Sequence, residues 1–123
     1  MPKYVSLFCY TGEAWQQMVR NPANRAEAVR VTIEHAGGEM HQFFWMLGDY
    51  DGLAIYSMPS EQAAAAYSAA ASASGRLSAA HTYQLLDSDD AAAALTLASM
   101  LQEVYHPPGT PSDWRSEYDA LGG

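Results

Sequence analysis

Residues 40–58 read MHQFFWMLGDYDGLAIYSM, and this stretch decides the fold of the 123-residue chain. Aromatic and β-branched residues, which favour strands, fill both ends of it. Between them lies Gly48-Asp49-Tyr50-Asp51-Gly52, and an Asp-Gly pair between apolar runs is a strong hairpin signal. We therefore predict two antiparallel strands joined by a tight turn.

The first strand of this hairpin has two apolar faces. Phe43 and Trp45 lie on one face, and Phe44 and Met46 lie on the other. An antiparallel strand with one face in water normally alternates apolar and polar residues. We therefore expect cover on both faces, from helices of the same chain on one side and from a second copy of the protein on the other.

Strand and helix signals follow one another in a recognisable order along the chain. Strands are expected at 3–10, 40–47, 52–58 and 76–86, and helices at 25–36, 60–74 and 89–105, with a short helical segment at 13–20. Asn24, Ser60 and Ser88 are the expected N-caps. The order predicts a ferredoxin-like βαββαβ unit, an α+β fold with a four-stranded antiparallel sheet, followed by an extra C-terminal helix.

Composition excludes several classes of function. The formal net charge of −8 disfavours nucleic acid and anionic membrane surfaces as partners. The single cysteine, Cys9, excludes an intramolecular disulfide and a cysteine-based zinc site, and we expect it to be buried and inert. No apolar run approaches the roughly 20 residues that span a membrane, and we expect no signal peptide. These features predict a cytoplasmic protein.

The motif Gly48-Asp49-Tyr50-Asp51 resembles that of the GYD-domain family, which is named for Gly-x-Tyr-Asp at the hairpin. Its preceding flank FWML is similar too, as are MPKYV at 1–5, NRAEA at 24–28 and the Gly37-Gly38 pair. The resemblance covers residues 2–86 and implies the ferredoxin-like fold in a dimeric α/β barrel, in which two sheets meet face to face. We expect a domain at 1–87, with the helix and tail at 88–123 packed on that domain or on the partner subunit.

Acid–base chemistry and turn formation are the two readings of the motif. Asp49 and Asp51 resemble the paired carboxylates that divide acid and base roles. Aspartate and glycine are also the residues that a tight turn requires. We interpret Gly48, Tyr50 and Asp51 as turn residues, with Tyr50 packed beside the end of the sheet.

An aromatic wall is predicted beneath the alanine-rich helix at 60–74. The expected hairpin pairs are Leu47–Gly52, Trp45–Ala54, Phe43–Tyr56 and His41–Met58. The candidate ligand-binding residues are Phe43, Trp45, Tyr56, Tyr67 and Tyr83. Such a wall suits a planar apolar ligand, and His41 or His81 would be the base for any proton transfer. The same side chains would also suit an aromatic core or a dimer interface.

Three functions follow from these features. The first is a homodimer that binds a small apolar or aromatic molecule between sheet and helices. The second is a cofactor-free oxygenase, isomerase or cyclase with a histidine base in that pocket, since the wider group of dimeric α/β barrels includes such enzymes. The third is a structural or regulatory dimer with no pocket. Glu34, His35, Glu39 and His41 crowd one segment but match no metal motif, so we expect neither a metal nor a cofactor.

Overall fold

The computed structural model describes residues 1–112, and the chain divides after Leu86. Met1–Leu86 form one unit, and helix α4 (Ser88–Leu101) belongs to a second unit that begins at Asp87. No residue of α4 is buried. The predicted packing of the helix and tail at 88–123 stays a prediction, and residues 113–123 lie outside the described part of the chain. Within residues 1–112, no helix combines the length and apolar character needed to cross a membrane.

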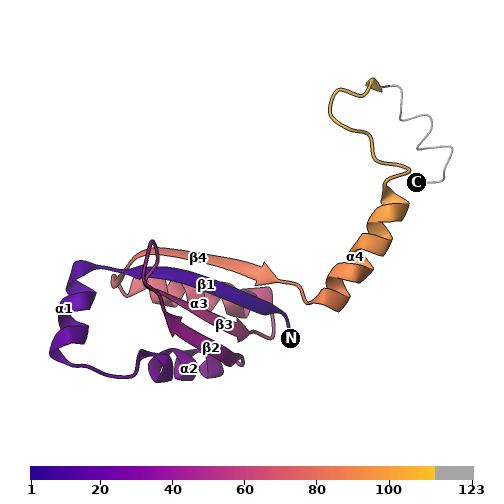
Figure 1. The fold of residues 1–123 in the computed structure, drawn as a ribbon. Helices are drawn as coiled ribbons and strands as arrows, with labels where there is room; N and C mark the ends of the chain where they lie inside the picture. Colours follow the sequence, from indigo (N-terminus) through magenta and orange to yellow (C-terminus); the bar gives the residue numbers. More distant parts are fainter. Residues whose placement is uncertain (113–123) are drawn as a thin grey trace. The chain divides into compact units, whose positions relative to one another are not determined.

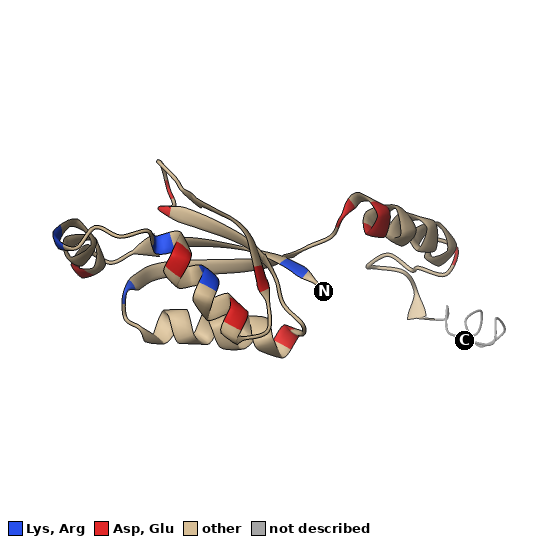
Figure 2. Ribbon diagram, turned by 90° about the horizontal axis from the view of Figure 1, so that it is seen from below, with Lys and Arg blue, Asp and Glu red and all other residues tan. Residues whose placement is uncertain are grey.

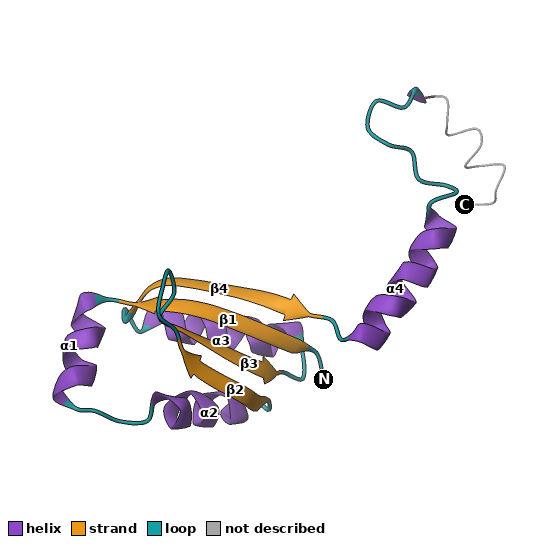
Figure 3. Cartoon of the chain, in the orientation of Figure 1, coloured by secondary structure: helices purple, strands orange, loops and turns teal. Residues whose placement is uncertain are grey.

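Four strands and three helices make up the first unit (Figures 1 and 3). They are β1 (Lys3–Tyr10), α1 (Gly12–Arg20), α2 (Arg25–His35), β2 (Glu39–Trp45), β3 (Gly52–Ser57), α3 (Glu61–Ala73) and β4 (Leu77–Leu85). The strands form one antiparallel sheet in the order β2-β3-β1-β4. The predicted ferredoxin-like α+β fold with an extra C-terminal helix is confirmed.

Side-chain caps start the helices at the residues that local chemistry favours. Asn24 Oδ1 accepts from Ala26 N at 3.0 Å, and Ser60 Oγ accepts from Ala63 N at 3.1 Å, as predicted. The prediction for α4 was wrong by one residue. Asp87, not Ser88, is the N-cap, because its carboxylate accepts from Asp90 N at 2.8 Å.

The register of the hairpin differs from the prediction by two residues. Trp45 lies opposite Gly52, and Phe43 lies opposite Ala54. Residues 46–51 connect the strands, and the Met46 N–H donates to Asp51 O at 2.8 Å. Gly52 suits this register because a Cβ atom there would lie 2.7 Å from the Phe8 ring. A shift of two residues leaves Phe43, Phe44 and Trp45 on their predicted faces.

A β-bulge changes the expected position of His41. The pairing of β2 with β3 shifts between Met40 and Gln42, so that Met40 lies opposite Tyr56 and Gln42 lies opposite Ile55. The extra residue of a bulge is left out of the ladder and its side chain is redirected. The predicted pair of His41 with Met58 is therefore wrong.

One face of the sheet, which we call the helix-covered face, carries the core. Tyr56, Ile33 and Met58 are fully buried there, and Tyr4 stacks on Tyr56 with ring centroids 5.8 Å apart. Helix α2 packs against β2 and α3 packs against β4 on this face (Figure 1). A buried hydroxyl pair joins the central strands, because Ser6 Oγ and Tyr56 Oη lie 2.8 Å apart. Burial of large aromatic side chains supplies most of the stability of such a layer.

The opposite side, which we call the open face, carries two rows of residues across the strands. They are Phe44–Leu53–Leu7–His81 and Gln42–Ile55–Val5–Tyr83. The side chains of this face are half-buried or exposed, and Phe44 and Tyr83 are each 53% exposed. Met1–Leu86 therefore bury one apolar face of their sheet and leave the other accessible.

Candidate functional site

A cavity of about 700 Å³ lies on the helix-covered face, among α1, α2 and α3. Two features of the molecule account for this open volume. Helices α2 and α3 pack on different strands, and α3 turns the small side chains of Ala70 and Ala71 toward the gap. The remaining lining residues are Phe8, Tyr10, Ala14, Gln17, Met18, Asn21, Ala23, Arg25, Ala28, Val29, Thr32, Tyr67, Ser74, Arg76 and Leu77. The volume is in the range of about 300–1,000 Å³ that is typical of small-molecule sites.

Aromatic side chains form the floor and one end of the cavity. Phe8 and Tyr10 line it from β1, with ring centroids 5.5 Å apart in an edge-on arrangement. Trp15 of α1 packs edge-on against Tyr10 at 5.6 Å. Leu77 and Val29 add aliphatic surface. The walls are therefore apolar on the side of the sheet and suit an apolar or aromatic ligand.

Arg25 is the principal polar group of the cavity. Its Nε atom is buried and has no hydrogen-bond partner among the described residues. An unpaired buried donor costs about 1–3 kcal/mol. None of the ion pairs of residues 1–112 includes Arg25. Its guanidinium is therefore a cation with unused donor capacity at a cavity wall.

Two tyrosine hydroxyls accompany this guanidinium. Burial raises the pKa of Tyr67 to about 12. Burial also raises the pKa of Tyr10, and the hydrogen bond from Arg25 opposes that increase. Both phenols are therefore protonated near neutral pH, when they donate hydrogen bonds and are not bases.

The charge at the cavity is opposite in sign to that of the chain. Acidic residues recur along the ribbon in Figure 2, and basic residues are few. Arg25 and Arg76 are two of only six basic side chains, yet both line this cavity. Arg76 is neutralised by Glu13, with Nη1 and Oε1 2.6 Å apart. No carboxylate from the described part of the chain lines the cavity, so the charge of Arg25 is not balanced there.

A second, smaller cavity of about 280 Å³ lies between α3 and β4. Tyr4 and Thr82 line it from the sheet, and Ala64 and Ser68 line it from α3. The Tyr4 hydroxyl is buried and has no hydrogen-bond partner among the described residues. This cavity is below the usual size of a small-molecule site.

The predicted aromatic residues are divided between the two faces. Tyr67 lines the larger cavity. Three more of the predicted residues do not line the cavity, but each packs against a ring that does. The ring centroids are 5.8 Å apart for Phe43 and Phe8, 6.0 Å for Trp45 and Tyr10, and 5.3 Å for Tyr56 and Tyr67. Tyr83 lies opposite Val5 on the open face. Grouping Tyr83 with the other four on one surface was therefore wrong, because the register of β4 turns it away from them.

The two candidate histidine bases also lie outside the cavity lining. His41 Nε2 lies 2.6 Å from Ser57 Oγ. His81 lies opposite Leu7 on the open face, and the Tyr50 ring packs edge-on against it at 5.8 Å. The expectation that His81 shares the aromatic surface was therefore wrong. Among residues 1–112, no group of three or more His, Cys, Asp or Glu side chains is arranged to hold a metal ion.

The Gly48–Asp51 motif connects the hairpin loop to β1. Gly48 has a φ of +139°, a conformation that favours glycine. Asp51 makes two bonds to β1, in which its N–H donates to Phe8 O at 2.9 Å and its Oδ2 accepts from Tyr10 N at 2.8 Å. The motif thus holds Tyr10, a wall of the cavity, at the end of its strand.

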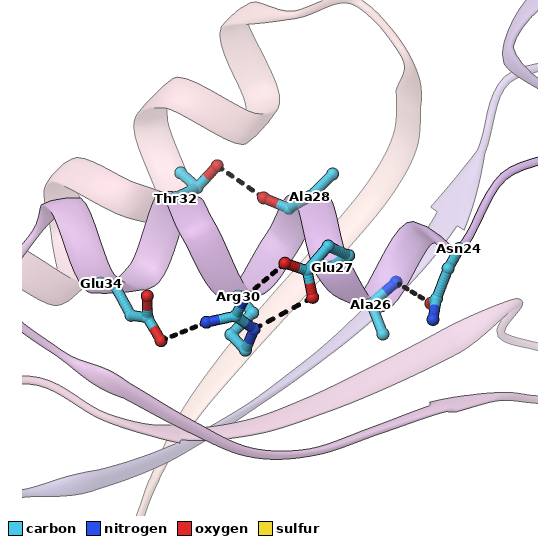
Figure 4. A network of polar contacts seen from close by, with 7 residues as sticks. All are labelled: Asn24, Ala26, Glu27, Ala28, Arg30, Thr32 and Glu34. Carbon is cyan, nitrogen blue, oxygen red and sulfur yellow. Dashed lines mark hydrogen bonds and ion pairs between the residues drawn. The ribbon is translucent and has the colours of Figure 1, made fainter.

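Sequence reasoning missed Arg25 and Tyr10 as site residues. One local signal was available for Arg25, because the positions three and four residues later are Ala28 and Val29. Arg30 on the same helix instead has Glu27 and Glu34 at pairing distance along the helix, and it binds both of them (Figure 4). An arginine without a helical partner is a candidate for tertiary or ligand contacts.

The sequence model of the GYD domain matches residues 4–95. The chain belongs to the GYD-domain family. The match spans the sheet and α1–α3, and it ends within α4. Among proteins of curated function, none matches this GYD-domain chain. The crystal structure of At3g17210 from Arabidopsis thaliana is similar at 15% identity and a TM-score of 0.39, over 72% of this chain and 96% of that one.

Proposed function

We propose that this GYD-domain protein is a homodimer that binds a small apolar or aromatic molecule in the cavity on its helix-covered face. The observation that carries the proposal is the cavity of about 700 Å³, with aromatic side chains on the sheet side and alanines on α3. Apolar walls with a few convergent polar groups are typical of small-molecule sites. The two candidate histidine bases do not line it, so binding is favoured over histidine-dependent turnover.

The open face supports the dimer. Val5, Leu7, Leu53 and Ile55 run through its centre and remain half-buried, with Phe44 exposed at one edge. Monomeric proteins rarely expose contiguous apolar surface of this kind. A second copy with the same face satisfies an isologous contact, in which each sheet covers the other.

Native mass spectrometry of the purified protein tests the dimer. We expect a dimer for the parent chain and a monomer for Leu7→Glu, because a carboxylate at the centre of the open face would be buried without a partner. Val19→Glu is the matched control, since Val19 is 74% exposed on α1, and this variant should remain dimeric. A monomeric parent protein would contradict this part of the proposal.

Uptake of the neutral fluorescent probe N-phenyl-1-naphthylamine tests the cavity. We expect uptake by the parent chain and a loss of at least about tenfold in affinity for Ala71→Leu, which fills the cavity from α3. Ala69→Leu adds the same side chain to an exposed position of α3 outside the cavity and should bind like the parent. Equal binding by both variants would place the probe elsewhere and contradict the proposed site.

A further inference from the structure

We propose that the ligand of the large cavity is an amphipathic anion, an aromatic or branched apolar body that carries one carboxylate bound by Arg25. This inference rests on the proposed function and names the chemical class of its ligand. It follows from the donors, the charge and the walls of the cavity, which all favour the same kind of molecule.

The donors of the site are more numerous than its acceptors. A guanidinium has five N–H donors in a planar fork that matches a carboxylate. Arg25 and Tyr10 line the same cavity, and the buried Nε–H of Arg25 has no partner in the described part of the chain. The Tyr10 O–H adds a further donor to the lining. A carboxylate in the cavity supplies acceptors for guanidinium and phenol donors, and a neutral apolar molecule supplies none.

The charge around Arg25 points to an anion rather than a neutral acceptor. The other cation of the lining, Arg76, is paired with Glu13, and no carboxylate of residues 1–112 lines the cavity. Asp51 lies next to Tyr10 but does not line the cavity, and its Oδ2 accepts from the backbone N–H of Tyr10 at 2.8 Å. One cation therefore remains without a counter-charge, and one anionic group on the ligand balances it.

The remaining walls determine the rest of the ligand. Phe8, Leu77 and Val29 offer aromatic and aliphatic surface, and Ala28, Ala70 and Ala71 leave room for a ring system. Tyr67 also lines the cavity, and we expect its hydroxyl to donate to an oxygen of the ligand. A second charged group on the ligand would lie against these apolar walls and lose its hydration without a partner. We therefore expect the ligand to be a monoanion.

The experiment compares two probes of the same shape, 2-naphthoate and its neutral analogue 2-naphthamide, by isothermal titration calorimetry. For the parent chain we expect 2-naphthoate to bind about ten- to hundredfold more tightly, because charge-assisted hydrogen bonds are stronger than neutral ones. Arg25→Gln should abolish this preference by weakening 2-naphthoate far more than 2-naphthamide, because the amide carbonyl accepts only neutral hydrogen bonds. Arg25→Lys keeps the charge without the planar fork, so it should retain part of the preference.

Arg30→Gln is the matched control for Arg25→Gln. Arg30 is on the same helix and is occupied by Glu27 and Glu34, so its loss should not alter either affinity (Figure 4). The parent chain could bind both probes with equal affinity, and Ala71→Leu could lose both. That result would overturn the proposal of an anionic ligand, and the cavity would remain the binding site. If neither probe binds, or if Ala71→Leu binds both like the parent, the proposed function fails and the inference fails with it.

Discussion

On the helix-covered face of the sheet, Tyr4 and Tyr56 are at most 5% exposed, whereas Phe44 and Tyr83 on the open face are each 53% exposed. The strands supply aromatic and aliphatic residues to both faces. The difference comes from α2 and α3, which pack on one side only. Apolar content therefore identifies a surface that needs cover, and the positions of the helices identify which surface the chain covers by itself.

The largest expected effect is a difference in the free energy of unfolding between substitutions on the two faces. Tyr56→Ala removes a fully buried ring from the helix-covered face and should lower the free energy of unfolding by about 3–5 kcal/mol in urea. Phe44→Ala truncates an exposed ring on the open face and should cost about 0.5 kcal/mol in the isolated subunit. An equal loss for both variants at every protein concentration would show that the open face belongs to the core of the subunit itself.

The pH dependence of stability at alkaline pH compares the two faces through one tyrosine hydroxyl on each. The pKa of Tyr67 in the folded protein, about 12, is above its ordinary value of 10.0, so the unfolded chain releases this proton first. The stability that Tyr67 contributes is present below pH 10 and is lost as the pH rises toward 12, by about 3 kcal/mol at most.

Urea unfolding across this alkaline range should therefore show a shallower loss of stability for Tyr67→Phe than for the parent chain. Tyr83→Phe removes a hydroxyl from the open face and serves as the control, with a loss that should follow the parent. If Tyr67→Phe also follows the parent, burial of the Tyr67 phenol in the folded state is not the cause of the alkaline loss.

The smallest expected effect concerns the motif loop, where Asp51 bonds to Tyr10 beside the cavity and Tyr50 contacts His81 on the open face. Asp51→Ala removes the acceptor for the Tyr10 N–H and should cost about 1–3 kcal/mol of unfolding free energy. Amide hydrogen exchange at Tyr10 should become faster in the same variant. Tyr50→Ala removes a contact with His81 on the open face, and it should leave exchange at Tyr10 unchanged. Equal acceleration in both variants would contradict the anchoring role of Asp51.

Local patterns were sufficient for the strands, the helices and most of the caps. Asn24 and Ser60 start α2 and α3 as predicted, because an N-cap depends on a side chain and an amide only two or three residues apart. The N-cap of α4 moved by one residue because Asp87 and Ser88 are both good caps and the pattern does not separate them. The motif and its flanks were sufficient for the family.

The candidate site was less accessible from the sequence. Tyr67, a predicted ligand-binding residue, lines the larger cavity, and its role in binding stays a prediction. The small side chains of the alanine-rich helix were compatible with close packing as well as with free volume above the sheet. Tyr83 and His81 were grouped with the wrong face, since the position of β4 relative to β2 depends on its pairing with β1 between them. Arg25 and Tyr10 were missed because they lie 15 residues apart, on either side of α1, and only the folded chain brings both to one cavity.

The sequence by itself determined the ferredoxin-like order of elements and the membership of the GYD-domain family, because both depend on signals a few residues long. Only the tertiary structure decided the hairpin register, the division of the aromatic residues between two faces, and the cavity around Arg25. Each of these depends on distances between segments far apart in the chain. The register, for example, suits Gly52 because the Phe8 ring from β1 occupies the space that a side chain would need.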